Sequence, residues 1–200
     1  MSYIFNDQRF LFKTITMAHA ETFEAISDAI ASKKGWHSGR YAQSERQYYI
    51  TRRKCVEHHL YTEYVEAYGP LQQTTPIYFY LFPNITKAKA LELAQQRTTY
   101  DEHAPKIAYV NIHELHDLSN ITFTLNDSFT SYRKKALASG INSREEEKDR
   151  PIFPDHNRIF PFSMLDLIHR KYQDMNPYYE VQIWNAHILE DAPVEILSTS

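Results

Sequence analysis

One carboxylate near the C-terminus lies in a stretch that otherwise looks like a buried strand. Glu180 stands within residues 178–184 (YYEVQIW), whose members are mostly the aromatic and β-branched types that strands favour. Side chains alternate along a strand, so Tyr178, Glu180 and Gln182 share one face and Tyr179, Val181 and Ile183 the other. This pattern places Glu180 either on the solvent face of an edge strand or on the floor of a cleft.

Cations and aromatic rings alternate in the N-terminal third of the chain. Such a mixture suits single-stranded nucleic acid, because bases stack on rings while phosphates pair with cations. Three glutamates in the same region dilute this signal, and a solvated basic face is the alternative interpretation. The residues concerned are Lys33, Lys34, Trp36, Arg40, Tyr41, Tyr48, Tyr49, Arg52, Arg53 and Lys54, diluted by Glu45, Glu57 and Glu63.

Residues 113–117 (HELHD) have the residue types of a metal site but not the usual spacing. A zinc-binding helix needs two residues between the glutamate and the second histidine so that both imidazoles share a face, and this stretch has one. A metal-dependent nuclease using His103, His113, His116 and Asp117 therefore stays as an alternative. Cys55 lies in a helical pattern, where a lone cysteine usually packs rather than reacts.

The composition predicts one globular domain over residues 1–200. The chain has 42% hydrophobic residues, 15 Tyr and 11 Phe against 4 Gly, which argues against disorder and against a glycine-rich phosphate loop. A formal net charge of −3 gives no global basic field, and a single cysteine excludes an internal disulfide. Without a secretory signal or a long apolar run, we expect a cytoplasmic protein with no membrane segment.

Hydrophobic periodicity predicts an α+β fold, because helices cluster early and the later strands follow one another. Residues 36–53 read as a loop or short irregular strand, and residues 138–162 as a loop or lid excursion. The predicted strands are 9–16, 76–82, 107–112, 121–125, 178–184 and 186–197, and the predicted helices are 18–32, 54–68, 84–97 and 163–172.

Several of these segments resemble the ADP-ribosyltransferase fold. Residues 10–16 (FLFKTIT), followed by an amphipathic helix with Phe23 and Ile26, are similar to its opening strand and helix. Residues 76–80, 107–110 and 123–128, and then the Glu180 strand, resemble in order and spacing the DarT-type branch, which modifies DNA. The resemblance covers most of the chain and implies a split β-sheet core with flanking helices, in which NAD+ binds in a cleft between two small sheets.

The resemblance also implies catalytic residues. Glu180 matches the family's catalytic glutamate, whose anion stabilises the oxocarbenium-like transition state and can take the acceptor's proton. The phosphate-contacting or catalysis-assisting arginine falls between residues 40 and 53. Arg40 ranks first because Gly39 gives local freedom, and Arg52 and Arg53 follow.

Further residues are expected to hold the two substrates. Lys13 and Thr14 would contact NAD+, although many relatives carry histidine or arginine where this chain has Lys13, and lysine donates without arginine's fork. Aromatic and cationic groups complete the two expected sets. Tyr78, Tyr80 and Arg52 are expected on NAD+, and Tyr178, Trp36 and Arg133 on the acceptor.

The sequence thus predicts an NAD+-dependent ADP-ribosyltransferase that uses no metal and transfers ADP-ribose to DNA or RNA. The resemblance further implies a toxin or phage-defence effector with a cognate antitoxin protein. Two alternatives stay open, a catalytically inactive binding module of the same fold and the metal-dependent nuclease.

Overall fold

The computed structural model describes residues 10–15, 46–71, 76–82, 86, 88, 89, 92, 106–142, 153–175, 178–190, 192 and 195–198. Within these residues, helices stand beside an antiparallel sheet, which confirms the α+β class. The strands are β1 (Phe10–Ile15), β2 (Ile77–Leu81), β3 (Lys106–Asn111), β4 (Ile121–Leu125), β5 (Phe160–Pro161), β6 (Tyr179–Ile183) and β7 (Glu195–Ser198). The α-helices are α2 (Arg46–Tyr68), α4 (Ser128–Ser131), α5 (Arg133–Ala138) and α7 (Leu165–Tyr172), and the 3-10 turns are η2 (Ile112–Glu114), η3 (Phe162–Met164), η4 (Gln173–Met175) and η5 (Ala186–Leu189).

The seven strands form one sheet in the order β5-β4-β6-β2-β1-β3-β7. Every pairing between neighbouring strands is antiparallel, and β6 lies inside the sheet between β4 and β2. Strands β1 and β2 share a single register pair, Phe12 with Tyr80, whereas β1 pairs with β3 along its whole length. The strands that we expected in two small sheets thus belong to one sheet, whose two parts meet at this pair.

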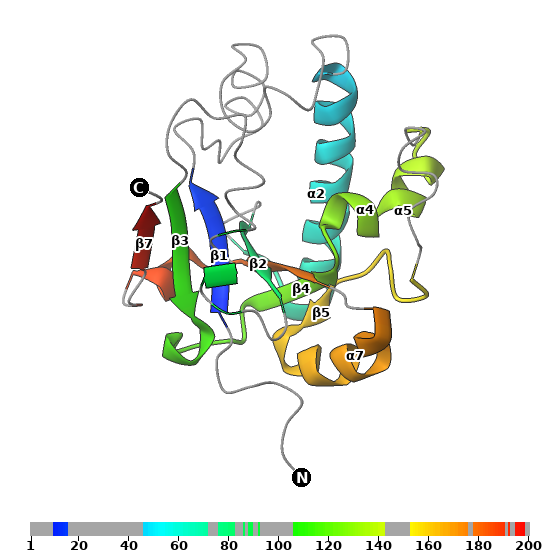
Figure 1. Ribbon diagram of the computed structural model, residues 1–200. Helices are drawn as coiled ribbons and strands as arrows, with labels where there is room; N and C mark the ends of the chain where they lie inside the picture. The colour runs from blue at the N-terminus through cyan, green and yellow to red at the C-terminus, as the bar shows by residue number, and fades with distance from the viewer. Residues whose placement is uncertain are drawn as a thin grey trace.

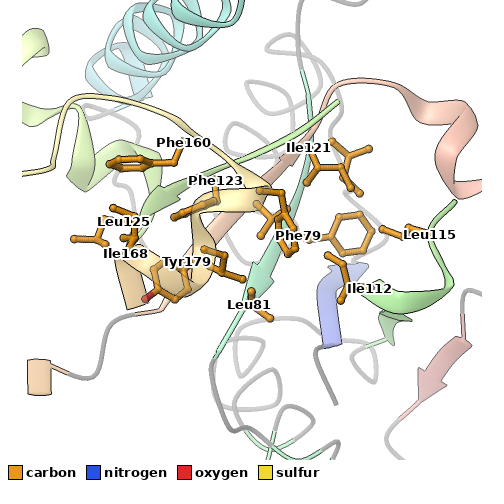
Figure 2. Close-up of a cluster of buried hydrophobic side chains, with 14 of the residues drawn as sticks. Phe79, Leu81, Ile112, Leu115, Ile121, Phe123, Leu125, Phe160, Ile168 and Tyr179 are labelled. Atoms are coloured by element: carbon orange, nitrogen blue, oxygen red, sulfur yellow. The ribbon is translucent and has the colours of Figure 1, made fainter. Parts of the chain in front are cut away.

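The main hydrophobic core covers one face of the sheet (Figure 2). Phe123 lies at its centre, with its ring centroid 5.3 Å from that of Phe160 and 5.4 Å from that of Tyr179. Alternate residues of β6 enter this core, as the period of a strand requires. Leu165, Ile168 and Tyr172 bring α7 onto the same face.

Helix α2 covers the opposite face. Val56, Leu60 and Tyr64 recur every four residues along one side of the helix and pack with Trp184 and Tyr132 in a second buried cluster. Figure 1 shows α2 rising beside α4 and α5, with α7 lying apart from it below β5. The helix ends at Tyr68 and is followed by Gly69, whose φ of 90° is the left-handed conformation that glycine adopts most readily. None of the described helices is long and apolar enough to cross a membrane.

Most of the predicted elements that fall on described residues are confirmed. They are the strands predicted at 9–16, 76–82, 107–112, 121–125 and 178–184 and the helices predicted at 54–68 and 163–172. The helix predicted at 18–32, and most of that predicted at 84–97, lie outside the described residues.

Three predictions need correction. Residues 46–53, expected as a loop or irregular strand, form the first turns of α2, because contacts with distant elements hold them in the helix. The strand predicted at 186–197 begins later, since η5 precedes β7. Within the predicted 138–162 excursion, Phe153 and Phe160 are buried in the main core, so that end of the segment is packed rather than lid-like.

Polar side chains on the α2 side of β4 and β6 form a buried hydrogen-bond network. The Thr122 hydroxyl donates to Gln182 Oε1 at 3.1 Å and accepts from the Trp184 indole nitrogen at 2.8 Å. Gln182 Nε2 donates to the Thr124 hydroxyl at 3.2 Å. Because these groups are buried away from water, their hydrogen bonds offset the free-energy cost of removing them from water.

Replacing Thr122 with Val tests this network. The change keeps the β-branched shape but leaves the indole N–H of Trp184 and the Oε1 of Gln182 without their partner, so we expect unfolding free energy to fall by about 2 kcal/mol. Urea denaturation measures the loss. Thr62→Val is the control, because that partly exposed hydroxyl donates to the His58 carbonyl of its own helix at 2.7 Å. Equal losses in both variants would contradict the network.

Candidate functional site

Glu180 lies in the interior of the sheet, so the edge-strand interpretation is wrong. It pairs with Tyr80 of β2 on one side and Thr124 of β4 on the other, and its exposed fraction is 4%. Tyr179 and Val181 enter the main core, which confirms that Glu180 and Gln182 share the opposite, more polar face. A carboxylate in this position has lost most of its water and depends on protein groups for stabilisation.

The turn after β4 brings a hydrogen-bond donor to Glu180. Asn126 has a φ of 60°, a left-handed conformation that asparagine tolerates better than most residues. Its backbone N–H donates to the Tyr178 carbonyl at 2.8 Å, and its carbonyl accepts from the Glu180 N–H at 3.2 Å. The chain then doubles back, so that the Ser128 N–H donates to Glu180 Oε1 at 3.1 Å.

Asp127, between these two residues, connects the turn to the strand beside it. Its Oδ1 accepts from the Thr130 N–H at 2.7 Å and caps the short helix α4. Its Oδ2 accepts from the Tyr178 hydroxyl at 2.6 Å. Hydrogen bonds therefore hold the turn to Glu180, through Ser128, and to Tyr178, through Asp127.

Helix α2 adds a charged pair above this turn. Arg53 Nη1 donates to the Ser128 hydroxyl at 3.2 Å, and its Nη2 lies 2.5 Å from Glu57 Oε1. Tyr78 donates its hydroxyl to the same Glu57 oxygen at 2.6 Å, and the Arg53 guanidinium lies 4.4 Å from the centroid of the Tyr78 ring. Arg53, Glu57, Tyr78, Asp127, Ser128 and Glu180 are called the Glu180 cluster below.

The surroundings of Glu180 shift its pKa to near neutral pH. Burial raises the pKa of Glu180 to about 7. The Arg53 charge and the hydrogen bond from Ser128 lower this pKa, and the Asp127 charge raises it further. Burial also raises the pKa of Tyr78 well above its usual range, so its hydroxyl stays protonated. A carboxyl group with a pKa near 7 can exchange a proton, or act as a fixed anion once positive charge develops beside it.

The structure brings three of the predicted site residues to this region. Tyr78 belongs to the Glu180 cluster, although Arg53 covers one face of its ring. Tyr178 and Tyr80 lie on the same side of the sheet, with ring centroids 6.1 Å apart, and Phe82 stacks on Tyr178 at 5.2 Å. These partly buried rings form an aromatic group beside Glu180.

Two of the predicted arginines are buried, and the contact expected of Arg52 is corrected. Arg52 is only 1% exposed and donates to the Phe129 carbonyl at 2.6 Å and to the Tyr48 hydroxyl at 2.7 Å, so it joins α2 to α4 instead of meeting a phosphate. Arg133 is buried, with 7% exposure, and its contact with the acceptor stays a prediction. Neighbouring residues on a helix point in different directions, which explains why Arg53 reaches the cluster and Arg52 does not.

The other predicted residues are described only in part. Arg40 and Trp36 lie outside the described residues. Lys13 and Thr14 belong to β1, where their backbones pair with Ala108 and Ile107, and their side chains are outside the described part.

Sequence reasoning missed or undervalued four members of the cluster. Arg53 ranked below Arg40, Glu57 counted only as a charge that dilutes a basic region, and Asp127 and Ser128 entered only as part of residues 123–128. The four-residue spacing of Arg53 and Glu57 on a helix was an available signal, because such residues face each other.

The histidines do not form a metal site in the part of the chain that the structure describes. No group of three or more potential ligands occurs there. His113 and His116 are exposed at η2 and just after it, and His103 lies outside the described residues.

Comparison with known proteins gives no relative for this chain. No family model matches it, and neither a curated protein nor a solved structure does.

Replacing Glu180 with Gln tests its burial. The folded-state pKa of about 7 lies above the ordinary 4.5, so the folded protein binds this proton more tightly than the unfolded chain does. The resulting stabilisation is complete below the ordinary value and is lost as pH rises through the folded-state value. We expect the unfolding free energy of Glu180→Gln, relative to that of wild type, to increase by about 2.5 kcal/mol from about pH 5 to about pH 8. Urea denaturation at both pH values measures the gain, and a difference independent of pH would contradict it.

Replacing Asn126 with Ala tests the turn. Alanine is strained at positive φ, so unfolding free energy should fall by about 1 kcal/mol, and the Ser128 N–H should shift from Glu180. Asn157, with a φ of 68°, provides the control, and its side chain also accepts from the Lys135 N–H at 3.2 Å. We expect Asn157→Ala to lose at least as much stability in urea denaturation, while only Asn126→Ala alters the pH dependence that comes from Glu180. Identical pH dependence in the two variants would contradict the role of the turn.

Proposed function

We propose that this protein is an NAD+-dependent ADP-ribosyltransferase in which Glu180 is the catalytic carboxylate. The observation that carries the proposal is the fixed position of Glu180 on an interior strand, buried, with Ser128 N–H on one oxygen and the Arg53 charge nearby. A preorganised anion in a water-poor site stabilises developing positive charge more strongly than it would in water. This is what rupture of the bond from nicotinamide to ribose requires.

In the proposed reaction, that bond breaks with its electron pair going to nicotinamide, which leaves as a neutral molecule. Positive charge develops on the ribose, and the Glu180 carboxylate stabilises it while accepting a hydrogen bond from a ribose hydroxyl. A nucleophile of the acceptor then bonds to the anomeric carbon and loses its proton. Glu180 can take that proton, and its pKa of about 7 suits proton transfer near neutral pH.

The register of the sheet supports NAD+ contacts from β1. Phe12, Tyr80, Glu180 and Thr124 form one row across four neighbouring strands. Lys13 and Thr14 follow Phe12 directly, two strands from the catalytic residue. Neighbouring residues of a strand alternate between the two faces, so the register supports a contact from only one of them. Because Arg52 is used within the fold, we assign the proposed phosphate contact to Arg40.

The aromatic group beside Glu180 supports a nucleic-acid acceptor. Tyr178 is held by its hydrogen bond to Asp127, and Phe82 and Tyr80 lie next to it. Rings of this kind stack on bases with little sequence preference, which fits single-stranded DNA or RNA. A toxin or defence role, with an antitoxin partner, belongs to the same proposal and comes from the resemblance alone.

Transfer of label from NAD+ to single-stranded DNA, to RNA and to a cell lysate tests the reaction. We expect label on a nucleic-acid acceptor with wild type, and a loss on the order of 100-fold or more with Glu180→Gln, which removes the anion but keeps the shape. Glu114→Gln is the control, because Glu114 is exposed at η2 and should leave transfer unchanged.

Absence of label on every acceptor, with NAD+ left intact, would overturn the transferase proposal. Nucleic acid that is bound equally well by wild type and Glu180→Ala would then identify a binding module. Cleavage of nucleic acid that a chelator abolishes, and that His113→Ala removes, would identify the nuclease instead.

A further inference from the structure

Glu57 occupies an unusual position for a helix carboxylate. It is 5% exposed, and one of its oxygens, Oε1, accepts from both Arg53 and Tyr78. Its other oxygen, Oε2, is buried and has no hydrogen-bond partner among the described residues. A carboxylate used only to join a helix to a sheet would gain from satisfying both oxygens, so the single-sided arrangement calls for a further explanation.

The contacts of Glu57 lead to Glu180 through a continuous chain. Glu57 holds the guanidinium of Arg53, and Arg53 donates to the hydroxyl of Ser128 at 3.2 Å. Ser128 in turn donates its backbone N–H to Glu180 at 3.1 Å. Four elements, α2, β2, the start of α4 and β6, are thereby linked around one carboxylate.

The charges around Glu180 give this chain an electrostatic consequence. Arg53 acts on it from α2, Tyr78 from β2 and Asp127 from the turn after β4, and Glu57 is paired with Arg53. Arg53 favours the anion of Glu180, whereas Asp127 disfavours it. Because the guanidinium lies 2.5 Å from Glu57, part of its positive charge is balanced there and its pull on Glu180 is weakened.

We propose that Glu57 is a positioning residue for Glu180, which holds Arg53 and Tyr78 beside it and balances the charge of Arg53. The balance leaves Glu180 responsive to a cationic group in a substrate instead of being dominated by the protein's own arginine. The value of this arrangement for transfer rests on the proposed function, whereas the link between Glu57 and the ionisation of Glu180 can be measured without any activity.

The variant Glu57→Gln separates the two roles of the carboxylate. Glutamine can still accept from Arg53 and Tyr78 through Oε1, but it carries no charge. The Arg53 charge then acts on Glu180 without the opposing charge of Glu57, and the anion of Glu180 becomes easier to form. We expect the titration midpoint of Glu180 to fall by about one pH unit.

Glu63→Gln is the matched control. Glu63 lies on the same helix and also joins it to other elements, since it accepts from the Tyr132 hydroxyl at 2.9 Å and from the Ile159 N–H at 2.9 Å and pairs with Lys135. None of these contacts involves the Glu180 cluster. A general loss of helix anchoring would therefore affect both variants, while the charge effect on Glu180 requires Glu57 alone.

The experiment is a carboxyl ¹³C NMR titration of the full chain, with the Glu180 signal assigned by its disappearance in Glu180→Gln. A midpoint lowered in Glu57→Gln and unchanged in Glu63→Gln supports the proposal, and an unchanged midpoint in folded Glu57→Gln overturns it. If Glu57→Gln does not fold, Arg53→Gln tests the same link, because loss of the cation must raise the midpoint. An unmoved midpoint in Arg53→Gln overturns the proposal as well.

The pH profile of label transfer connects this result to the reaction. We expect the acid limb of the profile to move to lower pH in Glu57→Gln by the same amount as the NMR midpoint. A shifted midpoint without transfer by any variant would support the role of Glu57 and remove the proposed function. Transfer that depends on Glu180, together with an unshifted midpoint in Glu57→Gln, would support the proposed function and overturn the role of Glu57.

Discussion

The burial of one carboxylate inside the sheet is the constraint on which the rest of the site depends. Glu180 has neighbours on both sides in β2 and β4, so water cannot stabilise its charge from either edge. The protein supplies substitutes from two directions, a backbone N–H from the turn at Asn126 and a guanidinium charge from α2. The left-handed residue, the short helix after it and the long helix above therefore serve the same local requirement.

Two buried ionisable groups, Glu180 and His156, change the stability of the fold in opposite directions as the pH changes. Glu180 favours its neutral form because burial raises its pKa to about 7, and this stabilisation disappears as pH rises toward that value. Burial lowers the pKa of His156 to about 4, so its stabilisation is complete above its ordinary value of 6.5 and disappears as pH falls. As pH rises from 4.5 to 6.5, the stabilisation from Glu180 falls and that from His156 grows. A comparison of wild type with Glu180→Gln therefore separates the contribution of Glu180 from that of His156.

Local patterns predicted the strands well and the contacts of α2 poorly, for a physical reason. The alternation in residues 178–184 reflects burial on one face, and that information is contained in the strand itself. Residues 46–53 have no apolar stripe, and Arg52 is held in the helix by the carbonyl of Phe129, which is distant in the sequence. Whether Arg52 or Arg53 belongs to the Glu180 cluster depends on how the helix is rotated over the sheet. The types of the neighbouring residues in the sequence do not show this rotation. The spacing of Arg53 and Glu57 predicts their pairing but not its place above Glu180.

The energetics of Glu180 argue for a role outside the stability of the fold. A carboxylate retained for a stabilising ion pair has a lowered pKa, because its partner favours the anion more than burial opposes it. Glu180 shows the reverse, since burial outweighs the charge of Arg53. A neutral glutamine could accept the same hydrogen bond from Ser128 without that cost. A destabilising charge at a fixed position, beside an arginine and a group of aromatic rings, is the kind of arrangement found where chemistry or ligand binding uses the charge.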